Sequence, residues 1–373
     1  MRHLLAAALA LIAPLLAQAS PREQPADTKD VVLFALRSEL LSAFWGREVR
    51  IEAGVVLPPA RSADEALPVC YSIHGFGGSH TSAWRNGPGL VTQMQSGYPR
   101  MLYVFLNAAC PLGHHEFADS VNNGPWGKAL TTEFVPALEA KFGAGGRPSA
   151  RFLTGHSSGG WSSLWLQVNY PDVFGGTWST APDSVDFRDF TGIDIYRFPN
   201  AYKDLQGAPI PLVRNGNAWV KTIQEFVTDD LRTRHYGGQF MSFDAVFSPR
   251  GDDGQPMHLF DATTGAIDGF VAEAWKKYDI ALLVRQRWAD LGPKLNGKLN
   301  LYVGTQDTFR LEGPMRLFAA ELKELGSDAT VVFAEGRNHG SLRDPHPELW
   351  PDGMLARIHR EMRARFDSQR KEK

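Results

Sequence analysis

The sequence predicts an α/β fold, with a mostly parallel twisted sheet, helices on both faces and a lid-like insertion. Two observations carry this prediction. Short, nearly continuous apolar runs alternate with segments of helical periodicity, which is typical of a parallel sheet covered on both faces. The alternation is interrupted only between about 183 and 296, where turn-rich and aromatic stretches replace it. We therefore expect one domain with an insertion at 183–296, before the strand at 299–303.

The strands are predicted from short runs of apolar residues. Residues 49–57 alternate in polarity and end at two prolines, as an early strand would. The other runs lack that alternation because a parallel strand is buried on both faces. These runs are 69–73, 101–107, 150–154, 175–179, 299–303 and 331–334.

Helices are predicted between these runs. In 130–142 the apolar residues recur every four positions, and Pro136 predicts a kink or a late start. A second helix covers 160–170, and a third covers 315–325, with Gly326 placed as its C-terminal cap. The closing stretch, 357–373, mixes charges of both signs, which predicts a solvated helix that frays.

The first residues have the pattern of a signal peptide, which we assign to 1–19. Arg2 and His3 precede an uncharged apolar run, and Ala17-Gln18-Ala19 supplies a small-x-small cleavage site before Ser20. The run is too short to span a bilayer comfortably. We expect a mature chain, 20–373, that is periplasmic or secreted and has no stable membrane insertion.

The charge and the positions of the cysteines argue against nucleic-acid binding and against a disulfide bond. The formal net charge is −2 and no basic run precedes the tail, so nucleic acid is not an expected partner. Cys70 opens one predicted strand and Cys110 lies beyond the end of the next. Parallel neighbours would then hold the two sulfurs too far apart for a disulfide, and we expect two free thiols.

The segment Gly155-His156-Ser157-Ser158-Gly159 fits the G-x-S-x-G pattern of a nucleophile elbow. A strand at 150–154 and a helix at 160–170 flank it, as the tight strand-to-helix turn requires. Such a turn exposes the serine hydroxyl at a helix N-terminus, where developing negative charge is favoured. The pattern predicts that Ser157 is a catalytic nucleophile.

A serine nucleophile needs a base, and the base needs an acid to orient it. His339 follows the last predicted strand, and Asp307 follows the strand at 299–303, which gives the chain order Ser, acid, His. The competing acid is Asp183, which follows the run at 175–179. We predict that Asp307 and His339 complete a catalytic triad.

Backbone donors for an oxyanion are predicted at two places. One is the N–H of Ser158, and the other is the N–H of Phe76 in the glycine-rich loop after the strand at 69–73, with Gly77 as second choice. The flanking residues are expected to line the substrate site; they are His74, Gly75, Gly77 and His156.

Together these motifs resemble the putative esterase (esterase D) family of the α/β-hydrolase superfamily. The resemblance rests on His74–Gly78, Asn123–Gly127, the elbow, Gly304-x-x-Asp307 and the loop at His339, and it covers about 49–179 and 299–342. It implies the α/β-hydrolase fold and the triad Ser157, Asp307 and His339. It also implies that Asn123 and Trp126 border the active site. The insertion departs from compact members of the family.

The predicted activity is hydrolysis of a carboxylic ester, small or glycan-linked, through an acyl-enzyme and without a cofactor. An acyltransferase using the same triad and a non-catalytic binding protein are the alternatives. A peptidase lacks any sequence signal for an anchor of a peptide terminus. His114, His115 and Glu116 are adjacent in a loop, where they rarely converge on one ion, so no metal site is predicted.

Overall fold

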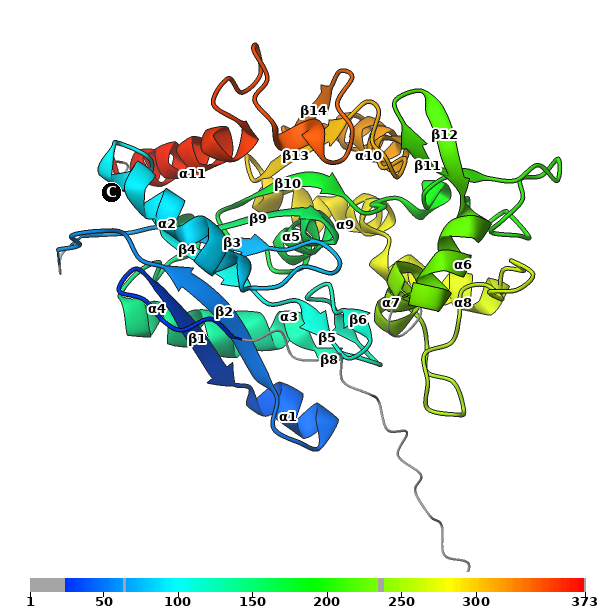
Figure 1. The fold of residues 1–373 in the computed structure, drawn as a ribbon, viewed down its shortest axis with the longest axis horizontal. Coiled ribbons are helices and arrows are strands. Elements are labelled where there is room, and N and C mark those ends of the chain that lie inside the picture. Colours follow the sequence, from blue (N-terminus) through cyan, green and yellow to red (C-terminus); the bar gives the residue numbers. More distant parts are fainter. Residues whose placement is uncertain (1–23, 63–64, 234–237, 372–373) are drawn as a thin grey trace, which may run out of the picture.

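The computed structural model describes residues 24–62, 65–233 and 238–371, so the predicted signal peptide lies outside the described residues. An eight-stranded sheet runs in the order β1-β2-β4-β3-β9-β10-β13-β14 (Figure 1). The pairs β1–β2 and β2–β4 are antiparallel, and the other neighbouring pairs are parallel. The predicted α/β fold with a mostly parallel sheet is confirmed.

The strands of this sheet follow the predicted apolar runs closely, with β1 as an addition. Their bounds are β1 Val31–Arg37, β2 Arg50–Val56, β3 Val69–Ile73, β4 Leu102–Leu106, β9 Arg151–Ser157, β10 Gly176–Pro182, β13 Leu299–Gly304 and β14 Thr330–Ala334. Three short hairpins lie outside the sheet: β5 Ala109–Cys110 with β6 Gly113–His114, β7 Asp119–Ser120 with β8 Gly124–Pro125, and β11 Pro211–Asn215 with β12 Ala218–Thr222.

Helices cover both faces of the sheet. Side chains of α2 (Ser82–Gln95) and α11 (Met354–Lys371) share one hydrophobic cluster on one face. The other face is covered by α4 (Val135–Phe142), α5 (Ser158–Asn169), α9 (Ile280–Leu295) and α10 (Glu312–Glu324). The other α-helices described are α1 Glu39–Trp45, α3 Trp126–Ala129, α6 Ile223–Thr233, α7 Gly238–Phe247 and α8 Gly269–Trp275, with turns η2 Pro148–Ala150, η3 Phe187–Asp189, η5 Lys276–Tyr278 and η6 Ser341–Arg343. Within the described ranges, none of the helices combines the length and apolarity needed to cross a membrane.

The C-terminal helix corrects one prediction. We expected 357–373 to be a solvated, fraying helix, but α11 begins at Met354 and packs one face into the core. Met354, Ile358, Met362 and Phe366 recur every four residues and are all buried. The charged residues occupy the remaining faces, and this is the amphipathic pattern of a helix that covers a sheet.

The helix at 130–142 starts earlier than predicted and contains a π-turn. The α3 segment begins at Trp126, and η1 (Leu130–Phe134) is a π-helical turn that leads into α4. Pro136 lies in the first turn of α4, where its missing N–H costs little. The late start is therefore wrong: helical structure runs from Trp126 through Pro136, with one wider turn before the proline.

The segment between β10 and β13 shares its core with the sheet. Phe190, Phe247 and Trp275 of this segment belong to the same buried cluster as Trp161 of α5 and Leu301 of β13. Its last helix, α9, packs against α5. The segment is therefore continuous with the sheet's hydrophobic core.

Candidate active site

The sequence-predicted functional residues converge at the carboxyl ends of the parallel strands. The glycine-rich loop follows β3, Ser157 ends β9, and Asp183 follows β10. Asp307 follows β13 and His339 follows β14. Ligands of open α/β sheets bind at this edge, which makes it the candidate active site.

Ser157 occupies a strained turn between β9 and α5. Its φ is 60° and its ψ is −127°, a conformation that non-glycine residues rarely adopt. Gly155 and Gly159 flank this turn, and neighbouring backbone lies too close to either of them for a side chain to fit. A Cβ on Gly155 would lie 2.0 Å from the carbonyl oxygen of Gly159, and a Cβ on Gly159 would lie 2.1 Å from that of Ile73. The G-x-S-x-G spacing therefore has a steric cause.

His339 and Asp307 form a hydrogen-bonded pair. The Nδ1 of His339 lies 2.8 Å from Oδ2 of Asp307, whose side chain is fully buried. The other carboxylate oxygen accepts the backbone N–H of Phe309 at 2.9 Å. Because the carboxylate only accepts, Nδ1 of His339 is the protonated nitrogen and Nε2 is left able to accept a proton.

His156, which precedes the nucleophile, lies against His339. The two rings lie 4.4 Å apart between centroids, so His156 packs against the imidazole of His339. The Nδ1 of His156 contacts Oγ1 of Thr180 at 3.0 Å. Burial holds the pKa of His156 well below its ordinary value, so its ring is neutral. We expected His156 to line the substrate site, and the structure places its ring against that of His339.

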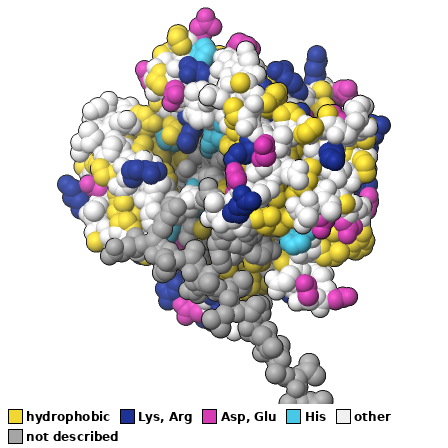
Figure 2. Space-filling view, turned by 45° about the vertical axis from the view of Figure 1, so that its right-hand side comes forward, with side chains coloured by type: hydrophobic (Ala, Val, Ile, Leu, Met, Phe, Trp, Pro, Cys, Tyr) yellow, Lys and Arg dark blue, Asp and Glu magenta, His cyan; other side chains and the backbone are white. Residues whose placement is uncertain are grey.

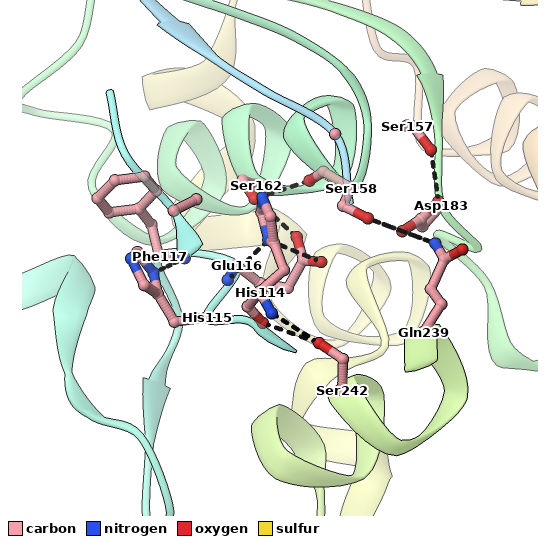
Figure 3. Close-up of polar contacts among 12 residues, drawn as sticks. His114, His115, Glu116, Phe117, Ser157, Ser158, Ser162, Asp183, Gln239 and Ser242 are labelled. Atoms are coloured by element: carbon pink, nitrogen blue, oxygen red, sulfur yellow. Dashed lines mark hydrogen bonds and ion pairs between the residues drawn. The ribbon is translucent and has the colours of Figure 1, made fainter. Parts of the chain in front are cut away.

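Asp183, the competing acid, lies against Ser157 and has no ion pair with His339. The Ser157 hydroxyl donates to Oδ1 of Asp183 at 3.3 Å, and the Ser158 hydroxyl donates to Oδ2 at 2.6 Å. Gln239 of α7 also donates to Oδ2, at 3.2 Å (Figure 3). Burial, with the nearby Glu116, raises the pKa of Asp183 to about 6. Sequence order indicated this residue only as an alternative acid.

A buried polar network connects this group to the loop at 114–117. Glu116 accepts a hydrogen bond from the Ser162 hydroxyl at 2.7 Å, and its Oε1 lies 3.1 Å from Nδ1 of His114 (Figure 3). Nε2 of His114 donates to the carbonyl of His74 at 3.0 Å. Burial raises the pKa of Glu116 well above its ordinary value and lowers that of His114 to about 4. A protonated Glu116 beside a neutral His114 leaves the pair without a buried charge.

The glycine-rich loop is a tight turn against the nucleophile. The N–H of Gly78 donates to the carbonyl of Gly75 at 3.0 Å, which makes Phe76 and Gly77 the central residues of the turn. Gly77 has a φ of 76°, as the third position of a type II turn requires. A Cβ on Gly75 would lie 3.2 Å from that of Ser157. The loop backbone is thus close to the nucleophile.

His74 fixes this loop through both of its ring nitrogens. Nδ1 donates to the carbonyl of Gly75 at 2.8 Å, and Nε2 accepts the N–H of Ala108 at 2.9 Å. Burial lowers the pKa of His74 to about 3, so the ring stays neutral. The tautomer follows from these partners because a carbonyl can only accept and an amide N–H can only donate.

Asn123 and Trp126 lie in the packed interior, away from the cavities described below. Asn123 is fully buried and donates to the carbonyl of Ala245 at 3.3 Å. The indole of Trp126 donates to the carbonyl of Asn123 at 2.9 Å and stacks on His115, with ring centroids 3.7 Å apart. These contacts support the loop of His114, and the two residues are not brought together with Ser157.

A large groove opens beside the site. It has a volume of about 1080 Å³, and its lining includes Gly75, Gly77, His156, Gly340 and Arg343. It extends between α2 and α11, where Arg85 and Gln93 add polar groups. The space-filling view shows a hollowed face with histidine side chains inside the hollow (Figure 2). A bulky polar ligand could occupy such a groove.

The remaining sequence predictions concern cysteines and metals. Cys70 and Cys110 are free thiols, as expected, and burial raises the pKa of each to about 12. Among the residues that the structure describes, no group of three or more His, Cys, Asp or Glu side chains is placed to hold a metal ion. His115 is committed to its stack on Trp126, and His114 and Glu116 to the buried network.

Solved structures with the same fold are numerous. A ferulic acid esterase superposes with a TM-score of 0.55 at 15% identity, over 90% of this chain and 98% of that one. The fluorophosphonate-binding serine hydrolase F of Staphylococcus aureus gives 0.52 at 12% identity, over 89% and 98%. An S-formylglutathione hydrolase from the same bacterium gives 0.52 at 13% identity, over 89% and 99%. At these identities the similarity establishes the α/β-hydrolase fold.

The family comparison is more specific than the structural one. No curated protein is a significant match to this chain. The family described as "Putative esterase" matches residues 45–309, which include the glycine-rich loop, the elbow and Asp307 but end before His339. Because this match spans well over half of the sequence, the chain belongs to the Putative esterase family of α/β-hydrolases.

Proposed function

We propose that this chain is an exported serine esterase that cleaves carboxylic esters through Ser157, His339 and Asp307. The observation that carries the proposal is the 2.8 Å pair between His339 and buried Asp307, at the same sheet edge as the strained Ser157. Nucleophile, base and acid occupy the three strand ends that this chemistry uses.

In the proposed reaction Ser157 Oγ attacks the ester carbonyl carbon while Nε2 of His339 takes the hydroxyl proton. The hydroxyl, which donates to Asp183 in this structure, must first turn toward His339. Asp307 stabilises the imidazolium that forms. His339 then protonates the leaving alcohol, and water activated by the same nitrogen releases the acid and restores Ser157.

The N–H groups of Ser158 and Phe76 are the proposed donors to the oxyanion. Ser158 is the first residue of α5, so its N–H belongs to the helix end that lacks an intrahelical acceptor. Phe76 is at the centre of the turn that packs against Ser157. Loss of one such donor typically lowers turnover by about 10²–10³.

The substrate is proposed to be a small-molecule or glycan-linked ester. The groove of about 1080 Å³ supports a bulky, polar alcohol part because it borders both the oxyanion loop and the loop after His339. No residue of the site calls for a cofactor in this chemistry.

Export to the periplasm or the medium is proposed from the pattern at 1–19. The mass of the N-terminal peptide of protein recovered from an extracytoplasmic fraction tests it. A peptide that starts at Ser20 supports cleavage and export, and a chain that keeps Met1 in the cytoplasm contradicts both.

The central experiment is labelling of the mature protein with a fluorophosphonate, followed by intact-mass measurement. We expect a single adduct that is lost in Ser157→Ala and kept in Ser96→Ala, which removes an exposed serine at the end of α2. Absence of an adduct on folded wild-type protein would refute the serine hydrolase and favour a non-catalytic binding protein on the same fold.

Acyl transfer by the same triad is the second candidate. It is favoured by the phenylalanine-rich wall that the insertion places beside Asp183, because apolar walls exclude water from an acyl-enzyme. Product analysis with added alcohol acceptors separates the two activities. New ester products support transfer, whereas free acid as the sole product supports hydrolysis.

A further inference from the structure

A small cavity lies beside Asp183, bounded by residues of the insertion. Its volume is about 30 Å³. Asp183 and Gln239 supply polar groups to its wall, and Figure 3 shows the Gln239 side chain extending from α7 toward Asp183. Most of the remaining wall is aromatic: Phe190, Phe226, Phe240, Phe243 and Phe309.

Two contacts tie this cavity to the candidate catalytic residues. Asp183 accepts the hydrogen bond from Ser157, as described above. The ring of Phe309 meets the ring of His339 edge to face, with centroids 5.0 Å apart. A group in the cavity would therefore belong to a molecule whose reacting carbonyl lies at Ser157.

The size of the cavity limits what it can hold. A volume of about 30 Å³ favours a small group at this position. An ammonium group and a methyl group are the two candidates of this size. The charge on the cavity wall decides between an ammonium group and a methyl group.

Asp183 is a buried carboxylate without a cationic partner. Asp183 is only 5% exposed, and it forms no ion pair with another described residue. The titratable groups around it are Glu116, His114 and His339, and His114 is neutral at physiological pH. Its other neighbours are the Ser157 and Ser158 hydroxyls and the Gln239 amide. A buried charge in this setting is costly until a cation joins it.

The aromatic wall favours the same kind of ligand. The phenylalanine rings pack edge to face, as in Phe190 with Phe243 at 5.4 Å and Phe226 with Phe240 at 6.0 Å between centroids. Aromatic faces attract ammonium groups, and the attraction grows when the cation is desolvated. A methyl group would gain from the rings but would leave the carboxylate without a partner.

We infer that Asp183 and the phenylalanines of this cavity form a subsite for a primary ammonium group of the ester substrate. Asp183 would contact both the Ser157 hydroxyl and the ammonium group at hydrogen-bond distance. The ammonium group would therefore lie about two or three bonds from the ester group. The inference rests on the proposed function, which it deepens by assigning a substrate class: esters that carry an amine. Asp183 is then a specificity-determining residue.

The test compares esters that differ only in an ammonium or a methyl group. In the acyl arm, 4-nitrophenyl 3-aminopropanoate is paired with 4-nitrophenyl butanoate. In the alcohol arm, the butanoate of 2-aminoethanol is paired with that of propan-1-ol. The measured quantity is the ratio of kcat/KM for the amino ester to kcat/KM for the neutral ester, and the arm with the higher ratio identifies the part that carries the amine.

For the wild type we expect this ratio to exceed about 10 in one arm at pH 7.5, as for a charge-assisted hydrogen bond. Asp183→Asn should lower it at least about tenfold. Glu324→Gln removes an exposed carboxylate at the end of α10, outside both the groove and the cavity, and should leave the ratio unchanged. In the wild type the ratio should also fall below about pH 6, where Asp183 takes up a proton. Any effect of pH on the shared catalytic step applies to both esters of a pair and cancels.

Three outcomes overturn the inference. One is a ratio of one or less in both arms, and another is a ratio that Asp183→Asn leaves unchanged. The third is a gain in neutral-ester activity in Asp183→Asn with no change for the amino ester, which identifies a methyl-sized occupant. Fluorophosphonate labelling of Ser157 in the same samples separates failure of the subsite from failure of the proposed function. Protein that is labelled but shows no preference for the amino ester refutes the subsite alone. Folded protein that is not labelled refutes the proposed function as well.

Discussion

The hydroxyl of Ser157 donates its hydrogen bond to Asp183, while Asp307 is the carboxylate that pairs with His339. Two buried carboxyl groups thus flank the candidate nucleophile and base from different strands, β10 and β13. They have different partners, and their substitutions should have different consequences.

Substitution of the two carboxylates should separate their roles. Asp307→Asn should lower kcat for a neutral aryl ester by about 10³–10⁴, because an amide favours the wrong tautomer of His339. Asp183→Asn should lower the same kcat less than about tenfold. Steady-state kinetics with 4-nitrophenyl butanoate measures both. A larger loss in Asp183→Asn would assign the triad acid to Asp183.

The stability of the protein should depend on Asp183 in a pH-dependent way. Its pKa is raised from 3.8 to about 6, so the unfolded chain ionises first and stability falls as pH rises across this interval. Asp183→Asn removes that penalty. We expect it to gain about 2–3 kcal/mol relative to the wild type between pH 4 and pH 7.5. Urea denaturation at both pH values measures this, and an equal difference at both would contradict it.

The elbow glycines should tolerate no side chain. In Gly155→Ala the added Cβ would overlap the backbone of Gly159, which no rotamer can relieve. We expect a loss of at least about 3 kcal/mol or failure to fold. Gly89→Ala is the matched control, since nothing lies within 4 Å of its added Cβ. Being helical, it should change the unfolding free energy by no more than about 1 kcal/mol, toward greater stability. Similar denaturation midpoints for the two variants would contradict the steric argument.

The buried face of α11 should contribute to global stability. Met362 is 0% exposed and Leu355, on the same helix, is 41% exposed. Met362→Ala should cost about 2–5 kcal/mol, whereas Leu355→Ala should cost less than about 1 kcal/mol. Denaturant unfolding compares the two. Equally small changes in the unfolding free energy of the two variants would indicate that α11 is a solvated helix, as the sequence predicted.

The two cysteines should be unreactive in the folded protein. Burial raises the pKa of each to about 12, so the thiolate that reacts with alkylating reagents is scarce. Iodoacetamide should leave the native mass unchanged and add two labels in denaturant without a reductant. A requirement for a reductant would reveal a disulfide and contradict the prediction.

Much of the fold was predictable because buried parallel strands carry a strong local signal. Residues 69–73, for example, coincide with β3. The first strand, β1, was missed because its apolar run passes into α1 with little turn signal between them. The buried face of α11 was missed although its four-residue spacing is present in the sequence, because the many charges of the segment obscured it.

The site was predictable only where the spacing of residues along the chain has a steric or topological cause. Ser157 and the strand-end positions of Asp307 and His339 followed from motif and order. The contact of Asp183 with Ser157 and the link from Glu116 to Ser162 depend on how loops meet in space. Asn123 and Trp126 were expected at the substrate and instead brace the interior, because an indole buried beside a histidine ring gains more from stacking than from solvent.

The shared core of the insertion has a consequence for re-engineering. Phe190 and Phe240, which line the cavity beside Asp183, belong to the same buried cluster as Trp161 and Leu301 of the framework. Grafting a relative's whole insertion onto this scaffold would break that cluster and unfold the host. New selectivity is better sought by altering single rings such as Phe226, which is only partly buried. The proposed subsite and the framework share one core, so selectivity at this subsite can change only in steps that the framework tolerates.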